Sequence, residues 1–414
     1  MIIRKSVNNV KDLNFDIERK VFNMNENYNP RRYDTPNRSR EFTDRVYSGV
    51  SDRPEELRNE TYGIEKTFYP AKSEYNIYFG ELHGHSCLSD GAPTADEYYI
   101  NIRDNAGLDF GALTDHDHGG IGNAELFGEK WEYIKTKAKE YYQPGKFTTL
   151  LAYERDSYPW YNNLVVYYDS HDGDMLIGDV TGEISRDLLS GALNNDSMLI
   201  VPHDTYSLDA GADFDSIDPS MFPPLLEIYS RGDSAEYFGN PLNIRDQLCR
   251  GGFWQDALRR GAKTGVIAAS DDHAMCNGLV KEDSGIGIKK YPGITGVLAK
   301  ENTLPAIFEA LKARRCYGFM GSGRMYIDFR INGHYMGEEF DCPDTRNVYF
   351  KVDSDTPVKE ITLVKNCEDY MIIRRSEQML YDRGTSCDTD IYYLRVELTD
   401  GRCGWTSPIW INNR

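Results

Sequence analysis

Short apolar runs recur along the chain from about residue 75, and each run is followed by a residue type that binds metal ions. The intervals between runs are roughly 25 to 45 residues, which is enough for a strand, a helix and two loops, as parallel β/α connections require. Repeated parallel units close naturally into a barrel, and the loops after the strands then meet on one rim. We therefore expect strands at 75–79, 110–113, 147–153, 198–201, 225–226 and 266–269.

Two helices between these runs can be predicted from their end signals. Thr94 and Glu97 have the spacing of a capping box, and Gly107 supplies a stop before the next strand. A second helix is expected from about residue 304 to residue 317, with apolar positions on one face and Gly318 at its end.

The apolar pattern changes at both ends of the chain. After about residue 319 apolar and polar positions alternate, and Asn332-Gly333 is a hairpin signal. We expect a small antiparallel β domain at 319–414, of the sandwich type. Residues 1–74 are polar, rich in Asn, Arg and Tyr, and lack sustained periodicity, which is typical of an extended arm. The expected α/β barrel therefore comprises residues 75–318.

The composition limits the classes of molecule that the protein is expected to bind. The formal net charge of −19 leaves no basic field to attract long nucleic acid or an anionic membrane, so a small-molecule substrate is expected. The chain has no apolar stretch of about 18 residues and no hydrophobic leader at its start, which favours a cytoplasmic protein. Its eight cysteines form no C-x-x-C pair and are expected to be mostly reduced. A homo-oligomer through the arm or the β domain is a further expectation.

The residues after the apolar runs are imidazoles and carboxylates. His83-x-His85 puts two imidazoles on one side of an extended segment, because side chains alternate with period two, and Asp271-x-His273 repeats that geometry. One such motif is often structural, but five of the eight histidines fall at expected strand ends. Mixed imidazole and carboxylate ligation suits zinc, manganese or iron, and the lack of a cysteine set argues against a structural zinc knuckle.

An ordered set of motifs resembles the PHP (polymerase and histidinol phosphatase) superfamily. It comprises G-E-L-H-G-H-S at 80–86, S-D-G at 89–91, L-T-D-H at 113–116, P-H at 202–203 and S-D-D-H at 270–273. Residues 296–317 are similar to a branch of that superfamily with an extra β domain, and the resemblance covers about 75–340. It implies a distorted seven-stranded β/α barrel that holds two or three divalent metal ions (zinc, manganese or iron).

The resemblance also implies a ligand set. The first metal would be bound by His83, His85, Glu154 and Asp271, the second by Asp90, His116 and His273, and the third by Glu154, His203 and Glu227. Glu154 would bridge metals. Asp90 stands where some relatives have histidine, and Glu227 where others use histidine or cysteine, so the loss of either would leave a dinuclear site.

Four residues beside the ligands are candidates for catalysis. Asp115 is expected to orient a ligand imidazole, with a turn cap as the alternative. His118 is either a general acid or a surface-loop residue. Arg155 and Arg231 could clamp an anionic substrate by bidentate hydrogen bonds or form ordinary salt bridges. Asp272, between two expected ligands, is expected to make a structural hydrogen bond.

These residues favour a metal-dependent hydrolase. Two cations that share a water lower its pKa from about 15.7 toward 7 and so provide hydroxide as the nucleophile. The cations would also neutralise a transferred phosphoryl group, and the resemblance makes a phosphoesterase the leading function. The same cluster could polarise a carbonyl, so an amide or ester hydrolase stays open. A non-catalytic carbohydrate- or protein-binding module is the alternative from another class.

Overall fold

The computed structural model describes residues 71–117, 126, 128–156, 161, 163–176, 185–207, 211–230, 232–243, 248–274, 277–280 and 291–414. All of them belong to one compact unit, Val46–Arg414. The arm expected at residues 1–74 lies outside the described residues except for its last four. None of the described helices combines the length and the apolar character that a membrane span needs.

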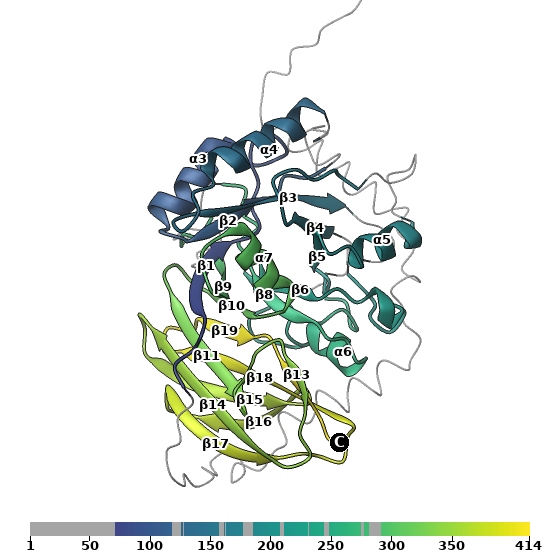
Figure 1. Cartoon of the computed structure of the whole chain (residues 1–414), viewed down its shortest axis with the longest axis vertical. Coiled ribbons are helices and arrows are strands. Elements are labelled where there is room, and N and C mark those ends of the chain that lie inside the picture. The colour runs from purple at the N-terminus through teal and green to yellow at the C-terminus, as the bar shows by residue number, and fades with distance from the viewer. Residues whose placement is uncertain are drawn as a thin grey trace, which may run out of the picture. The chain divides into compact units, whose positions relative to one another are not determined.

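Parallel β/α units form at two places, as the apolar runs predict (Figure 1). Strands β1, β2 and β3 pair in parallel, and helices α3 and α4 pack beside them. Strands β6 and β8 form a second parallel pair, with α6 between them in the chain. The bounds are β1 (Asn76–Glu81), α3 (Ala95–Ile100), η4 (Asn101–Asn105), β2 (Phe110–Leu113), α4 (Glu129–Tyr141), β3 (Thr148–Asp156), β6 (Leu225–Ser230), α6 (Trp254–Arg259) and β8 (Gly265–Ala268).

The expectation of an entirely parallel strand order is wrong. Strand β4 pairs antiparallel with both β3 and β5, and β9 pairs antiparallel with β1 and β10. The link 157–162 between β3 and β4 is too short for a parallel crossover, which needs a dozen or more residues. Among the described residues β5 lies next to β6, but no backbone pairing joins the two strands into a closed ring. The bounds are β4 (Asn163–Tyr168), α5 (Arg186–Leu193), β5 (Met198–His203), η5 (Pro219–Met221), β7 (Asp233–Ser234), β9 (Gly293–Ala299) and β10 (Cys316–Met320).

The two helices predicted from end signals have different outcomes. Helix α3 begins with the expected capping box, in which the Thr94 hydroxyl accepts from the Glu97 amide and the Glu97 carboxylate accepts from the Thr94 amide. Helix α7 (Leu304–Lys312) is shorter than predicted. Arg314 has a φ of 60°, a left-handed conformation that ends the helix, and the residues expected at its end form the buried strand β10.

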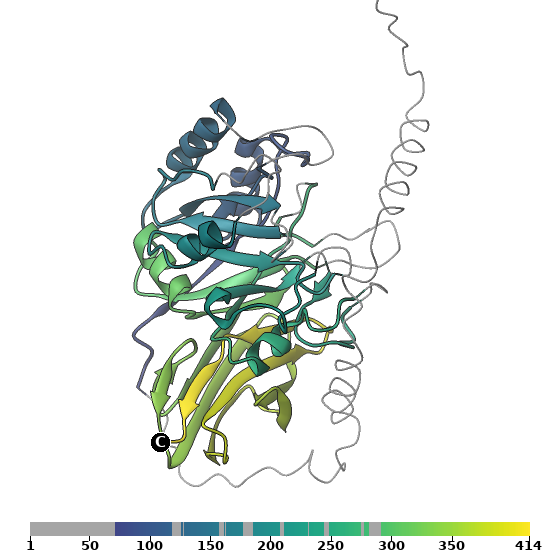
Figure 2. The ribbon, with the colours of Figure 1, turned by 90° about the vertical axis from the view of Figure 1, so that its right-hand side faces the viewer.

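The β-rich region (residues 319–414) contains two layers of strands, which pair antiparallel except for β13 and β20 (Figure 2). One is the four-stranded sheet β12-β11-β14-β17, and the other continues through β10 into the large sheet of the first region. Phe350 of one layer and Leu394 of the other belong to one apolar core. Asn332 and Gly333 both have positive φ and form the predicted hairpin turn. The bounds are β11 (Met325–Ile331), β12 (His334–Tyr335), β13 (Glu339–Asp341), β14 (Thr345–Ser354), β15 (Val358–Lys365), β16 (Glu368–Ile373), β17 (Glu377–Arg383), β18 (Thr389–Leu398), β19 (Cys403–Thr406) and β20 (Ile409–Asn412).

A buried carboxylate fastens the β-rich region to the α/β strands. Glu236, which follows β7, is fully buried and accepts hydrogen bonds from Tyr393, Arg395 and Trp405 at 2.7–2.9 Å. Strand β10 also spans the expected boundary at 318/319, pairing with β9 on one side and β19 on the other. The two regions therefore share a sheet and a buried ion pair, and the boundary drawn from the sequence stays a prediction.

Candidate metal centre

Nine side chains from the ends of six strands meet in one cluster, which we call the metal centre. Glu154, His203 and Glu227 lie on β3, β5 and β6, whereas the others follow β1, β2 and β8, and all nine are ligand residues expected from the sequence. They form three groups, and within each group the potential ligand atoms lie within 4.8 Å of one another. The groups are His83, His85, Glu154 and Asp271; His85, Asp90, His116 and His273; and His83, His203 and Glu227.

All four residues of the first group are buried. His83 and His85 are 0% exposed, and their Nε2 atoms lie 3.1 and 3.2 Å from Glu154 Oε2. Asp271 Oδ1 lies 3.1 Å from His85 Nε2 and 3.6 Å from His83 Nε2. The two imidazoles and two carboxylates thus aim at a common point, as the H-x-H spacing predicts.

Glu154 touches members of all three groups. Its Oε2 also lies 3.3 Å from His116 Nδ1, while its Oε1 lies 2.9 Å from His203 Nε2. A carboxylate whose two oxygens face different sets of imidazoles has the arrangement needed to bridge two cations. The Asn163 side chain donates to Oε1 at 2.7 Å and so holds the carboxylate in this orientation.

The third group differs from the expected set because His83 takes the place of Glu154. His83 Nδ1 lies 3.0 Å from Glu227 Oε2. His203 Nδ1 and Glu227 Oε1 are both buried, have no hydrogen-bond partner among the described residues, and face each other at 3.7 Å. A tetrahedral zinc ion with bonds of about 2.0–2.2 Å holds its ligand atoms roughly 3.4 Å apart, so this pair fits a shared cation.

The second group lies nearest the solvent. The side chains of Asp90, His116 and His273 are 22%, 14% and 29% exposed, whereas those of the other six ligands are at most 2% exposed. The His85 ring stacks against those of His116 and His273, with centroids 4.6 and 4.1 Å away, and the latter two rings are tilted by 40° with centroids 6.3 Å apart. Three imidazoles at these distances would repel one another if all carried protons. A cation bound by neutral rings avoids that repulsion.

The carboxylates of the centre raise the pKa values of the buried imidazoles beside them. Burial alone would lower the pKa of His85, but hydrogen bonds to Asp271 and Glu154 raise it to about 9. The pKa of His203 is also raised to about 9, against the effect of burial, by the charge of Glu154 and by further carboxylates. Burial would raise the pKa of Glu154, yet nearby imidazoles, His83 foremost, hold it well below its usual range. Glu154 thus stays ionised and draws protons or cations to the centre.

Two ligand-bearing turns contain left-handed residues other than glycine. Asp271 has a φ of 46°, and Asp204, directly after His203, has a φ of 52°. Such conformations cost about 1–3 kcal/mol each and persist where the surroundings enforce them, often at functional sites. The expectation that Asp271 and His273 share a side of an extended segment is therefore wrong, because a turn at Asp271 brings both to the centre.

Asp115 has a different contact from the one expected. Its carboxylate accepts hydrogen bonds from the Ser86 amide at 2.8 Å, the Ser86 hydroxyl at 2.7 Å and the Ser89 hydroxyl at 2.6 Å. Among the described residues it bonds to no ligand imidazole, because these three donors of the neighbouring loop occupy it. Asp115 thus fixes the loop that carries Asp90.

The remaining candidates are settled only in part. The buried Arg155 forms an ion pair with Asp117 and donates to the Leu176 carbonyl at 2.9 Å, which is the salt-bridge alternative rather than a substrate clamp. Asp272 accepts from the Ala274 amide at 2.8 Å, in keeping with the expected structural role. His118 and Arg231 lie outside the described residues.

Two positioning residues were missed by the sequence analysis. Glu81 is fully buried and accepts from the amides of Ser270 at 2.9 Å, Gly278 at 3.1 Å and His83 at 3.2 Å, so it joins the ends of β1 and β8. Burial raises its pKa to about 8 despite the hydrogen bonds from Ser270. A charge inside an apolar run, two residues before His83, could have signalled it. Asn163 was missed because β4 carries no ligand and was not predicted.

The chain is similar to a protein family and to bacterial proteins whose descriptions name no function. A family model described as a protein of unknown function (DUF3604) matches residues 111–175. A protein of Chlamydia pneumoniae, described as uncharacterised, is 25% identical over 373 residues, which cover 83% of this chain and 58% of that protein. An uncharacterised protein of Chlamydia trachomatis is 26% identical over 245 residues, covering 52% and 38%. The chain therefore spans little more than half of the first of these relatives and less of the second.

Two solved structures show weak likenesses. One is a two-domain protein of Bacteroides vulgatus containing a predicted PHP-like metal-dependent phosphoesterase. It is 13% identical, with a TM-score of 0.43 over 85% of this chain and 100% of that one. The other comprises fibronectin(III)-like modules of Clostridium thermocellum CbhA, 18% identical, with a TM-score of 0.19 over 22% of this chain and 98% of that one. These descriptions apply to those proteins, and the site of this chain must be understood from its own residues.

Proposed function

We propose that this protein is a metal-dependent hydrolase of the PHP superfamily that cleaves a small phosphorylated substrate. The supporting observation is the convergence of nine imidazole and carboxylate side chains, from six separate strand ends, into three groups that Glu154 connects. We include in this proposal the distorted seven-stranded barrel of that superfamily, since the proposed ligands lie on or after successive strands in chain order.

The proposed cofactors are two or three divalent cations, zinc, manganese or iron. The buried ligand atoms without hydrogen-bond partners among the described residues, His203 Nδ1 and Glu227 Oε1, support a cation in the third group. When bound, the cations would supply an activated water and neutralise the charge of the phosphoryl group.

The protein's own residues orient the centre. Asn163 donates to Glu154 and keeps one carboxylate oxygen on each side of the bridge. The Glu227 carboxylate lies beside His83 Nδ1, where it can accept a hydrogen bond from the Nδ1–H group and so leave Nε2 facing Glu154. Asp115 holds the loop that leads to Asp90. These contacts hold the ligands in place before substrate arrives.

The exposure of the ligands indicates where substrate enters. Asp90, His116 and His273 form the solvent-facing side, so the scissile phosphate is proposed to approach that group. Arg155 is held by Asp117 in the interior, which leaves the cations as the main anchor for an anionic substrate. We further propose that the protein works in the cytoplasm, because all seven cysteines among the described residues are free thiols.

The test is a hydrolysis screen on the full chain reconstituted with zinc, manganese or iron. Phosphomonoesters, phosphodiesters, amides, carboxylic esters and glycans would be offered to the wild type, to chelated protein and to Glu154→Gln. We expect release of inorganic phosphate or of a monoester that disappears in the last two samples.

Phosphate release that survives chelation and Glu154→Gln would contradict the proposal. Metal-dependent cleavage of amides or carboxylic esters alone would replace the phosphoesterase with the rival hydrolase. A protein that cleaves nothing and binds a glycan equally well without metal would favour the binding module.

A further inference from the structure

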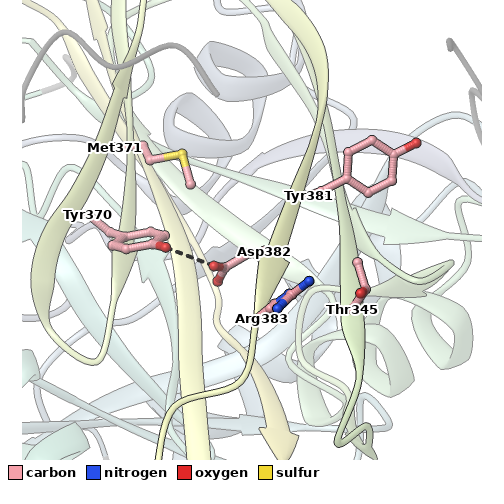
Figure 3. A pocket seen from close by; sticks show the side chains of 6 residues that line it. All are labelled: Thr345, Tyr370, Met371, Tyr381, Asp382 and Arg383. Atoms are coloured by element: carbon pink, nitrogen blue, oxygen red, sulfur yellow. Dashed lines mark hydrogen bonds between the residues drawn. The ribbon is translucent and has the colours of Figure 1, made fainter. Parts of the chain in front are cut away.

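A pocket in the β-rich region lies outside the metal centre (Figure 3). Its volume is about 370 Å³, within the range of roughly 300–1,000 Å³ that is typical of small-molecule sites. Strands β14, β16 and β17 supply the lining. Among the described residues β16 pairs only with β15 and β17 only with β14, so two strand edges flank the pocket. It is lined by Thr345, Tyr370, Met371, Tyr381, Asp382 and Arg383.

A neutralised polar network forms one wall of the pocket. Asp382 is buried and accepts hydrogen bonds from Tyr370 at 2.8 Å, from Tyr392 at 2.7 Å and from Lys365 at 2.7 Å. Burial would raise the pKa of Asp382, but the bond from Lys365 and the two tyrosines keep it below its usual value. The carboxylate is therefore satisfied and paired, and it offers little repulsion to an incoming anion.

Arg383 is the unbalanced charge of the pocket. Its side chain is exposed and makes no hydrogen bond or ion pair with any described residue. Other arginines of the same region, Arg346, Arg395 and Arg402, are each paired with carboxylates. A guanidinium without a partner presents a planar fork of donors that matches a carboxylate or a phosphate.

Aromatic and hydroxyl groups accompany this charge. Tyr381 is 39% exposed and is one of four large hydrophobic residues exposed in the described part of the chain. The thioether of Met371 adds apolar surface, and the hydroxyls of Thr345 and Tyr370 add polar atoms at the rim. A ring that shows an apolar face to solvent beside hydroxyl groups suits the C–H face and the hydroxyls of a sugar.

We propose that this pocket binds an anionic carbohydrate, with the sugar ring against Tyr381 and its carboxylate or phosphate on Arg383. Both anions present the same pair of oxygens to the guanidinium, so the chemistry they share is what the pocket recognises. The proposal does not depend on hydrolysis at the metal centre, because no residue of the pocket belongs to that centre.

Calorimetric titration of the full, metal-loaded chain tests this assignment. The ligands are glucuronate, glucose 6-phosphate, neutral glucose and inorganic phosphate. Arg383→Met removes the charge in the pocket, and Arg375→Met is the matched control, because Arg375 is also exposed but does not line the pocket. We expect Arg383→Met to weaken binding of at least one of the two charged sugars about tenfold or more, as loss of a charged hydrogen bond does.

The outcomes show which anion the pocket binds, and they separate binding in the pocket from hydrolysis at the metal centre. Arg383-dependent binding of glucuronate identifies a carboxylate, and such binding of glucose 6-phosphate identifies a phosphate. Tyr381→Ala should weaken the same ligand, and hydrolysis by Arg383→Met should equal that of the wild type. No binding of either charged sugar up to about 10 mM would overturn the proposal. Equal losses in Arg383→Met and Arg375→Met, or Arg383-dependent binding of neutral glucose or free phosphate as strong as that of the charged sugars, would overturn it as well.

Discussion

Buried carboxylates occur in both regions of the molecule, but their charge is balanced in different ways. In the β-rich region Asp390 pairs with Arg346 and Asp382 with Lys365, and at the junction of the two regions Glu236 pairs with Arg395, so each acid faces a cationic base. In the metal centre the ion-pair partners that the described residues supply to the buried Glu154, Glu227 and Asp271 are all histidines.

This difference distinguishes carboxylates that stabilise the fold from carboxylates that are suited to bind metal ions. An arginine or lysine neutralises a neighbouring acid at any physiological pH, whereas an imidazole can give up its proton and become a metal ligand. The first kind of cluster is complete without a cofactor. The second kind is balanced only by protons or by cations, and its burial makes that balance a strong requirement. The predictions below test the distinction.

The largest effect is expected from the bridging carboxylate. Glu154→Gln keeps the shape but removes the charge that faces four imidazoles, so hydrolysis should fall by more than about 100-fold, beyond the loss typical of outer-shell residues. The measurement is kcat together with the metal content of the purified variant. Glu301→Gln, at an exposed position away from the centre, is the control. Unchanged activity and metal content in Glu154→Gln would show that the carboxylates of the metal centre do not serve to bind cations.

Breaking the buried ion pair between Arg346 and Asp390 should lower the stability of the fold without changing metal binding. Arg346→Met leaves Asp390 buried without its cation, which should cost about 3–5 kcal/mol in the free energy of unfolding. Denaturant unfolding measures this cost, and Arg346→Met/Asp390→Asn should recover part of it. Metal bound per folded molecule should stay at the wild-type level. A selective loss of metal would show that this pair serves the centre.

A smaller effect is expected from the residue that orients the bridge. Asn163→Ala removes the 2.7 Å hydrogen bond to Glu154 without removing a ligand, so metal affinity or activity should fall about 10- to 100-fold. A competition assay with a chromogenic chelator measures the affinity. If Asn163→Ala binds metal and turns over substrate as the wild type does, Asn163 has no positioning role.

The smallest effect concerns pH and the metal-free protein. The pKa values of His85 and His203 are raised from 6.5 to about 9 in the folded chain, so their protons stabilise the fold. That contribution is complete below about pH 6.5 and is lost as the pH rises through about 9. The Tm of chelated protein should therefore fall across this window, and cation-loaded protein should show a weaker fall. Equal profiles would contradict the idea that protons and cations substitute for one another.

Local signals predicted the strands and ligands well, because both depend on short stretches of sequence. The H-x-H motif at His83 and the polar residues after the apolar runs identify strand ends, and the structure brings those ends together. Strand direction depends instead on link length and on distant partners, which is why β4 and the antiparallel pairs were missed. The left-handed conformation of Arg314 is imposed by its surroundings, and its residue type carries no signal for it.

The same reasoning explains the errors around the centre. Asp115 and Arg155 are residue types suited to catalysis, but their partners, Ser86 and Asp117, are set by the packing of neighbouring loops. Glu81 and Asn163 show the converse, since each acts through a contact that only the fold creates. Ligand identity could be predicted from the sequence, whereas the residues that hold the ligands could not.

The most direct test of the account is the metal content of the folded protein. The full chain would be chelated, reconstituted with zinc, manganese or iron, freed of loose ions and analysed by elemental mass spectrometry beside Glu154→Gln and Arg346→Met. The account predicts two or three equivalents per chain in the wild type and in folded Arg346→Met, and a clear deficit in Glu154→Gln. A folded wild type that retains no metal above background would contradict it.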